Sequence, residues 1–211
     1  MEKLHLTADP VLYSPPADHF IEVDVPELPF LMIDGQGAPE SEEYAAAIGA
    51  LYSVSYGIKF AGRVHRKVDY VVGPLEGLWW TDPESAFATT PRAQWRWTMM
   101  IRQPDWVEPA DVEASIERAR FKTPAIVGLR FAHWREGRCV QIMHIGPYAD
   151  EAPTIERLHA EYLPEHDLVP NGHHHEIYLS DPRRAAPARW RTVLRQPVAA
   201  ADRAAAGVRG A

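Results

Sequence analysis

The chain has 211 residues, of which 46% are hydrophobic and 24% are charged, a balance typical of a folded domain with a sizeable core. Its 22 basic and 29 acidic side chains give a formal net charge of −7, which argues against nucleic acid as a partner and favours neutral or cationic ligands. A lone cysteine, Cys139, excludes an internal disulfide. No run approaches the roughly 20 apolar residues of a membrane span, so we expect a cytoplasmic protein with no membrane partner.

The first half of the chain predicts strands and helices in alternation. Two hydrophobic runs around Pro26 and Pro29 indicate paired strands. Tyr44, Ile48 and Leu51 then recur at helical spacing, which predicts that they pack on a sheet. The predicted elements are strands 20–25 and 30–33, a helix 40–56, a strand 68–80, a polar loop 81–91, a strand 95–102 and a helix 109–121.

The second half predicts the same order again. Residues 125–134 and 138–145 indicate a hairpin that turns at Glu136-Gly137. A helix over 151–163 follows, with Ile155 and Leu158 facing the core, and then strands over 174–179 and 190–196. The order strand, strand, helix, strand, strand therefore occurs twice.

Short matching segments indicate that the two halves are duplicates. Residues 76–83 (EGLWWTDP) parallel 176–182 (EIYLSDP), and residues 97–104 (WTMMIRQP) parallel 190–197 (WRTVLRQP). We predict a mixed α/β (α+β) fold of two strand–helix–two-strand modules, related by a pseudo-twofold axis around a central ligand pocket. The predicted organisation is an N-terminal extension (1–17), one domain (18–198) with repeats 18–121 and 122–198, and a disordered tail (199–211).

The matching segments place one glutamate in each predicted repeat, Glu76 and Glu176. Because side chains alternate along a strand, Ile177 and Leu179 share one face and Glu176 and Tyr178 the other. If the apolar face packs on the helices, Glu176 and Tyr178 project toward the other repeat, and Glu76 lies on the equivalent face. The alternative is that both glutamates face solvent or pair with nearby arginines.

Aromatic residues surround these positions in the sequence. Carboxylates among aromatic rings suit planar or cationic molecules, because a ring face attracts a cation by up to about 2 kcal/mol once water is excluded. Two carboxyl groups at one cavity also permit acid and base catalysis on water. The candidate ligand-binding residues are Tyr52, Trp79, Trp80, Trp97, Trp134 and Tyr178, and the candidate catalytic residues are Glu176, Glu76 and Tyr148.

The sequence does not indicate a metal or cofactor site. His173, His174 and His175 are consecutive, and because neighbours on a strand point to opposite faces, the three cannot all face one metal. No cysteine pair or His-Glu-x-x-His spacing completes a zinc site. No phosphate-binding loop or nucleophile elbow is present either. We therefore expect no metal and no cofactor.

Several segments, in order, resemble the GyrI-like (DNA gyrase inhibitor-like) family over about residues 18–198. They are 74–80 (PLEGLWW), 95–98 (WRWT), 144–148 (HIGPY) with Asp150-Glu151, and 171–184 (NGHHHEIYLSDPRR). The resemblance implies two modules around a pocket in which a glutamate meets cationic ligands. A stand-alone branch of the family is similar to this chain. That branch hydrolyses the cyclopropane of DNA-alkylating natural products of the yatakemycin and duocarmycin type, which implies catalytic roles for Glu176 and Glu76 with aromatic walls.

Three functions remain open from the sequence. The first is a hydrolase that opens such rings by adding water, which would provide self-protection or detoxification. The second is a multidrug-type binding or sensing protein without chemistry. The third is a protein–protein inhibitor, of a topoisomerase for example. No helix-turn-helix segment is evident, which disfavours a self-contained transcription factor. We expect a monomer or weak homodimer that binds a small molecule and no nucleic acid.

Overall fold

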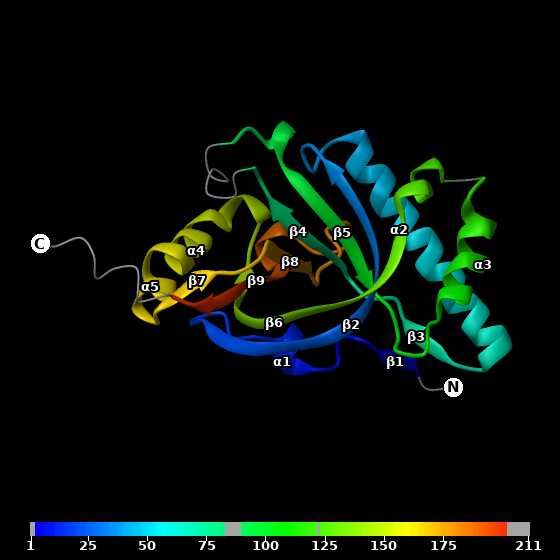
Figure 1. The fold of residues 1–211 in the computed structure, drawn as a ribbon, viewed down its shortest axis with the longest axis horizontal. Coiled ribbons are helices and arrows are strands. Elements are labelled where there is room, and N and C mark those ends of the chain that lie inside the picture. The colour runs from blue at the N-terminus through cyan, green and yellow to red at the C-terminus, as the bar shows by residue number, and fades with distance from the viewer. Residues whose placement is uncertain (1–2, 83–89, 122, 202–211) are drawn as a thin grey trace, which may run out of the picture.

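The computed structural model describes residues 3–82, 90–121 and 123–201. Its centre is a six-stranded antiparallel barrel in the order β6, β2, β5, β4, β8, β9, closed by pairing between β6 and β9 (Figure 1). Strand β7 pairs with β9, and β1 pairs with β3. The strands are β1 (Lys3–His5), β2 (Ile21–Gln36), β3 (Asp69–Val71), β4 (Leu75–Trp80), β5 (Arg96–Arg102), β6 (Arg130–Ile145), β7 (Leu168–Pro170), β8 (His174–Tyr178) and β9 (Arg191–Ala200).

Helices flank the barrel on two sides, with α2 and α3 at one side and α4 and α5 at the other (Figure 1). The helices are α1 (Pro10–Tyr13), α2 (Glu42–Ala61), α3 (Pro109–Ala119), α4 (Ala152–Arg157) and α5 (Leu163–Glu165). A π-helical turn, Leu158–Tyr162, joins α4 to α5. The predicted α+β class is confirmed. None of the helices in the described ranges has the length and apolar character that a membrane span requires.

The predicted hairpins at both repeats are wrong, because β2 and β6 are each one continuous strand of 16 residues. The two strands pair with each other instead. A proline has no N–H to donate, yet the pairing resumes on both sides of Pro26, with Val25 opposite Gly137 and Glu27 opposite Arg135. Gly137 has φ 77°, which a glycine adopts at little cost and which lets β6 continue where a turn was expected.

The second half of the molecule repeats the first, in the order β2, α2, β4, β5 and then β6, α4, β8, β9. Details of the backbone recur as well. The amide of Gly37 donates to the carbonyl of Trp95 at 2.8 Å, and the amide of Gly146 donates to the carbonyl of Trp190 at 3.0 Å. Both glycines have positive φ, 116° and 146°. Strand β9 continues to Ala200, so the start of the predicted tail is strand, and the tail from residue 202 lies outside the described residues.

Apolar side chains fill the barrel and its contact with α2. Met100 and Ile177 point into the barrel, whereas Trp97, Met99 and Ile101 on the outer face of β5 pack against α2. Leu51 and Leu158 are buried, as the helical spacing predicts. The helix residues Tyr44, Ile48 and Ile155, however, are only partly buried and line a cavity.

A network of charged groups lies inside the barrel. The His175 ring contacts Glu136 through Nδ1 at 3.0 Å and Glu76 through Nε2 at 3.1 Å, and Arg195 contacts Glu136 at 3.1 Å. Arg195 also donates to the backbone carbonyl of Leu12 at 2.6 Å, which fixes the N-terminal segment at the end of the barrel. All four charged side chains are at least 97% buried.

The charges of this network shift the pKa values of His175 and Glu136. Burial alone would lower the pKa of His175, but the carboxylates of Glu136 and Glu76 outweigh it and raise the pKa. Burial would likewise raise the pKa of Glu136, yet His175 and Arg195 hold it below its usual range. The two carboxylates therefore favour the protonated ring, and His175 stabilises the fold through these contacts while it carries that charge.

We predict that His175→Gln lowers the free energy of unfolding by about 3–5 kcal/mol at pH 6, because it leaves buried carboxylates without their cation. Because folding raises the pKa of His175, its contribution is complete below the unfolded pKa of about 6.5 and is lost as the pH rises through the folded pKa. Urea unfolding between about pH 6 and 9 should show a larger decline in the wild type than in the variant. Equal stability and equal slopes, with His173→Gln as the control, would contradict this role.

Candidate functional site

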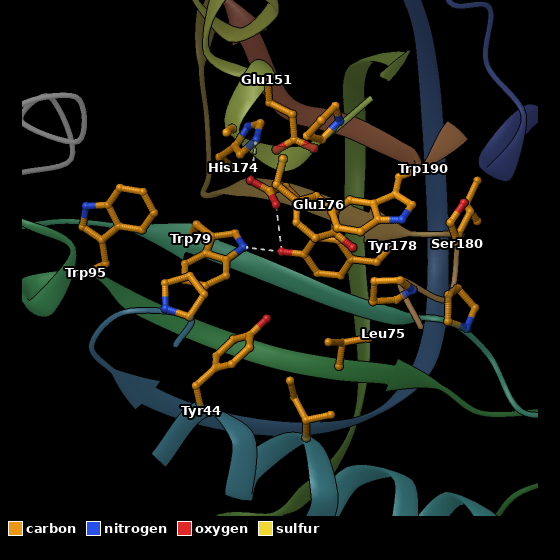
Figure 2. A pocket seen from close by; sticks show the side chains of 18 of the residues that line it. Tyr44, Leu75, Trp79, Trp95, Glu151, His174, Glu176, Tyr178, Ser180 and Trp190 are labelled. Atoms are coloured by element: carbon orange, nitrogen blue, oxygen red, sulfur yellow. Dashed lines mark hydrogen bonds and ion pairs between the residues drawn. The ribbon is translucent and has the colours of Figure 1, made fainter. Parts of the chain in front are cut away.

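A cavity of about 2300 Å³ opens on the outer face of β4 and β8. Leu75 and Trp79 of β4 and Glu176 and Tyr178 of β8 form its floor, between α2 on one side and α4 on the other (Figures 1 and 2). The cavity therefore lies where the two halves of the molecule meet. Its walls include Tyr44, Ile48 and Tyr52 of α2, Glu151 and Ile155 at α4, and Trp95, Tyr148 and Trp190 of the connecting segments.

A chain of hydrogen bonds on the floor orients Glu176. The indole Nε1 of Trp79 donates to the hydroxyl of Tyr178 at 2.9 Å, and that hydroxyl donates to Oε2 of Glu176 at 2.7 Å (Figure 2). Burial, and then the negative charge of Glu176, raise the pKa of Tyr178 well above its usual value. Tyr178 therefore stays protonated and serves as a donor, which leaves Oε1 of Glu176 to face the cavity.

Glu151 provides a second carboxyl group at the same cavity. It is the residue before α4 and is 4% exposed, and its Oε1 atom has no hydrogen bond to any residue that the structure describes. Burial, and then the negative charge of Glu176, raise the pKa of Glu151 to about 9, against a smaller opposite effect of the Thr192 hydroxyl. Glu151 therefore carries a proton at neutral pH. A protonated carboxyl group beside a second carboxyl group can act as an acid next to a base.

Aromatic rings enclose these carboxyl groups. On the α2 side, Tyr44 stacks on Trp79 with ring centroids 5.8 Å apart, and Trp95 meets Trp79 edge-on at 5.8 Å. On the other side, Tyr148 contacts Tyr178 at 5.4 Å and Trp190 at 4.7 Å. Such a cavity fits a flat organic molecule. No group of three or more His, Cys, Asp or Glu side chains in the described ranges is placed as metal ligands would be.

The structure brings some of the predicted site residues together and separates others. Trp97 is fully buried beneath α2, with its ring against Gly35, where an added Cβ would lie 2.2 Å from the ring. Trp134 packs inside the barrel. Trp80 lies outside the cavity and stacks on His173, with ring centroids 4.2 Å apart. The predicted residues that do line the cavity are Tyr52, Trp79, Tyr148, Glu176 and Tyr178.

The expectation that Glu76 and Glu176 face one cavity is wrong. Strand β4 pairs with β8 so that Gly77 lies opposite Glu176, and Glu76 lies opposite Ile177. Since a register difference of one residue moves a side chain to the other face, Glu76 enters the barrel, where it is 1% exposed and contacts His175. Ile177 was predicted to face the helices, but it points into the barrel.

Sequence reasoning did not assign Glu151, His174 or Trp190 to the site. Glu151 has the sequence signature of an ordinary acidic residue at a helix start. The matching segments paired Trp190 with Trp97, whereas the structure makes Trp190 the counterpart of Trp95. Each indole donates to the backbone carbonyl five residues earlier, Trp95 to Thr90 at 3.0 Å and Trp190 to Ala185 at 2.9 Å.

Three solved structures from Listeria innocua are similar to this chain. An uncharacterized conserved protein is 38% identical with a TM-score of 0.85, and the match covers 93% of this chain and 100% of that one. Two structures described as hydrolases are 36% identical, with TM-scores of 0.79 and 0.81, and cover 93% and 94% of this chain and 100% of theirs. No curated protein matches the sequence.

Residues 20–199 match the family model described as GyrI-like small molecule binding domain. The match spans the whole barrel, the flanking helices and the cavity between them. The chain therefore belongs to the GyrI-like family of small-molecule-binding domains.

Proposed function

We propose that this protein is a hydrolase that opens a strained, electrophilic ring of a planar substrate by adding water. The substrate class we propose is the cyclopropane of DNA-alkylating natural products of the yatakemycin and duocarmycin type, whose hydrolysis would protect DNA. The observation that carries the proposal is the pair of carboxyl groups at one aromatic cavity, Glu151 with a pKa of about 9 and Glu176 held by Tyr178. The two hydrolase-named relatives, at 36% identity, support the reaction class.

In the proposed reaction Glu176 is the base and Glu151 the acid. The water oxygen bonds to a ring carbon while Glu176 accepts a proton from that water. The carbon–carbon bond of the cyclopropane breaks, and its electron pair moves into a conjugated carbonyl. Glu151 donates its proton to the carbonyl oxygen, which becomes a phenol. The product is the substrate plus one water, and transfer of the proton from Glu176 to Glu151 restores the pair.

The aromatic residues hold the substrate in this arrangement. Tyr44, Trp79 and Trp95 form one wall and Tyr148 and Trp190 the other. Burial, followed by the charges of Glu151 and Glu176, raises the pKa of Tyr148 to about 12, so its hydroxyl remains a hydrogen-bond donor at the rim of the cavity. A planar substrate that displaces water from between the aromatic walls also strengthens the electrostatic effect of the two carboxyl groups on the reacting atoms.

Binding or sensing of planar cations without chemistry is the second candidate. The observation that favours it is the set of aromatic rings around the carboxylate of Glu176. An ion pair between that carboxylate and a cationic ligand at 4 Å would contribute about 4 kcal/mol at an effective dielectric constant of 20. A binder needs no proton on Glu151, whereas a hydrolase needs a donor. The two candidates therefore differ in what the glutamates do.

We predict that Glu176→Gln lowers turnover of a synthetic spirocyclopropyl cyclohexadienone by about 100-fold or more, because the amide cannot accept a proton. Mass spectrometry of the product, which gains one water, measures the rate. Affinity for a neutral planar ligand should stay within about threefold, since the aromatic walls are intact. Glu161→Gln, the same change at an exposed residue of the π-helical turn outside the cavity lining, is the matched control.

The same assay separates the two candidate functions. If the wild type only binds, no water is added, and Glu176→Gln weakens a planar cation by roughly 1–3 kcal/mol while neutral ligands are unaffected. Full turnover by Glu176→Gln would remove Glu176 from the proposed chemistry.

We also predict that Glu151→Gln raises the free energy of unfolding by about 0.5–2 kcal/mol at pH 8 while it abolishes turnover. Folding raises the pKa of this carboxyl from about 4.3 to about 9, so in the wild type the free energy of unfolding falls as the pH rises between these values. The glutamine cannot ionise, and that part of the pH dependence should disappear. Chemical denaturation at pH 5 and pH 8 measures it, and a variant that is less stable at both would contradict the assignment.

A further inference from the structure

His174 is a buried imidazole at the cavity. It begins β8, lies on the same face as Glu176 and Tyr178, lines the cavity and is 8% exposed. Within the part of the chain that the structure describes, neither Nδ1 nor Nε2 makes a hydrogen bond. The next residue, His175, points into the barrel and uses both ring nitrogens. Two adjacent histidines on one strand therefore differ completely in how their nitrogens are satisfied.

A buried polar group without a partner destabilises a protein, because it has lost its hydrogen bonds to water. Such a group needs an explanation, and at a cavity the simplest one is a molecule that enters the cavity and bonds to it. The nearest charged atom supports this explanation. Nε2 of His174 lies 3.6 Å from Oε1 of Glu176, the oxygen that Tyr178 leaves unused (Figure 2).

This distance is too long for a good direct hydrogen bond, and groups at such a separation are commonly bridged by water. A single water at ordinary hydrogen-bond lengths, about 2.8 Å, can contact both Nε2 and Oε1 from the cavity side. It would be held at two points between a base and the space where a flat substrate fits. Either tautomer of the ring can serve, since water both donates and accepts.

We propose that His174 is a positioning residue that, together with Glu176, holds the water that attacks the substrate. The inference rests on the proposed hydrolase function and adds a third side chain to its two carboxyl groups. One O–H of the water points at Glu176, and the contact with His174 fixes a second direction, so that a lone pair faces the substrate. The ring neither gains nor loses a proton over the reaction. Its contribution is orientation, and a displacement of about 1 Å in such a site can lower the rate about 100-fold.

The test compares His174→Phe, which keeps a flat ring without polar atoms, with His174→Gln, which keeps a hydrogen-bonding group near the position of Nε2. His173→Phe, a change of the neighbouring imidazole outside the cavity, is the matched control. For each protein we would measure kcat and KM for hydrolysis of a spirocyclopropyl cyclohexadienone. Affinity for the ring-opened phenol, from quenching of tryptophan fluorescence, and the melting temperature would also be measured.

We expect His174→Phe to lose about 100-fold in kcat, while its KM and its affinity for the phenol stay within about threefold. His174→Gln should recover at least about tenfold of that loss, and His173→Phe should match the wild type. The Phe variant should melt at or above the wild-type temperature, because it removes unsatisfied polar atoms.

Four results would overturn the inference. Unchanged kcat in His174→Phe, with an active wild type, would remove His174 while leaving the proposed function in place. A loss of phenol affinity equal to the loss of kcat would mean that the ring contacts the ligand and not the water. A glutamine variant no better than phenylalanine would show that no hydrogen bond is involved. A wild type that does not hydrolyse the probe would overturn the proposed function and this inference with it.

Discussion

The closed sheet allows each strand residue only one of two environments, and the site depends on this alternation. On β8, Glu176 and Tyr178 face the outer cavity while His175 and Ile177 between them face the barrel interior. The pairing of β4 with β8 sets the same division on the neighbouring strand, where Trp79 faces out and Glu76 faces in. One layer of backbone therefore separates two sets of ionisable groups, one in the barrel interior and one in the outer cavity.

Inside the barrel every charge has a counter-charge. Glu136 is in contact with both His175 and Arg195, and Arg195 is joined to the N-terminal segment through Leu12. Within the described residues, buried polar atoms without a hydrogen bond occur on Glu76 in the barrel and on Glu151 and His174 in the cavity. Unsatisfied groups lower stability, and each one calls for an explanation. Those of Glu151 and His174 lie beside Glu176, where an entering molecule can reach them, which supports the outer face of β8 as the place of the proposed chemistry.

Much of the architecture follows from the sequence, because it depends on local patterns. The repeated order of elements, the helices around Leu51 and Leu158 and the aromatic surroundings of Glu176 are all visible as periodicity or as matching segments. What could not be predicted depends on pairing between distant strands. Alternation shows that neighbouring side chains face opposite ways, but the β4–β8 register decides which face enters the barrel, and so the placement of Glu76 was wrong.

The errors in the predicted site, both the residues wrongly included and those missed, have a related cause. Trp97 and Trp134 resemble cavity walls in the sequence, yet the packing of α2 buries Trp97, and closure of the barrel places the partly buried Trp134 against its interior. Glu151 and His174 look unremarkable as a helix-start acid and one of three histidines. Their importance comes from burial beside Glu176, which arises only when the start of α4 and strand β8 come together within the second module.

The central claim is that a planar electrophile binds between the two walls with its ring at Glu176. A crystal structure of the Glu176→Gln variant soaked with an intact spirocyclopropyl cyclohexadienone tests it most directly. We predict that the flat ligand stacks against Trp79 and Tyr44, with its cyclopropane beside residue 176 and its carbonyl oxygen at hydrogen-bond distance from Glu151. A ligand bound outside this cavity, or one bound with its carbonyl turned away from both carboxyl positions, would contradict the account.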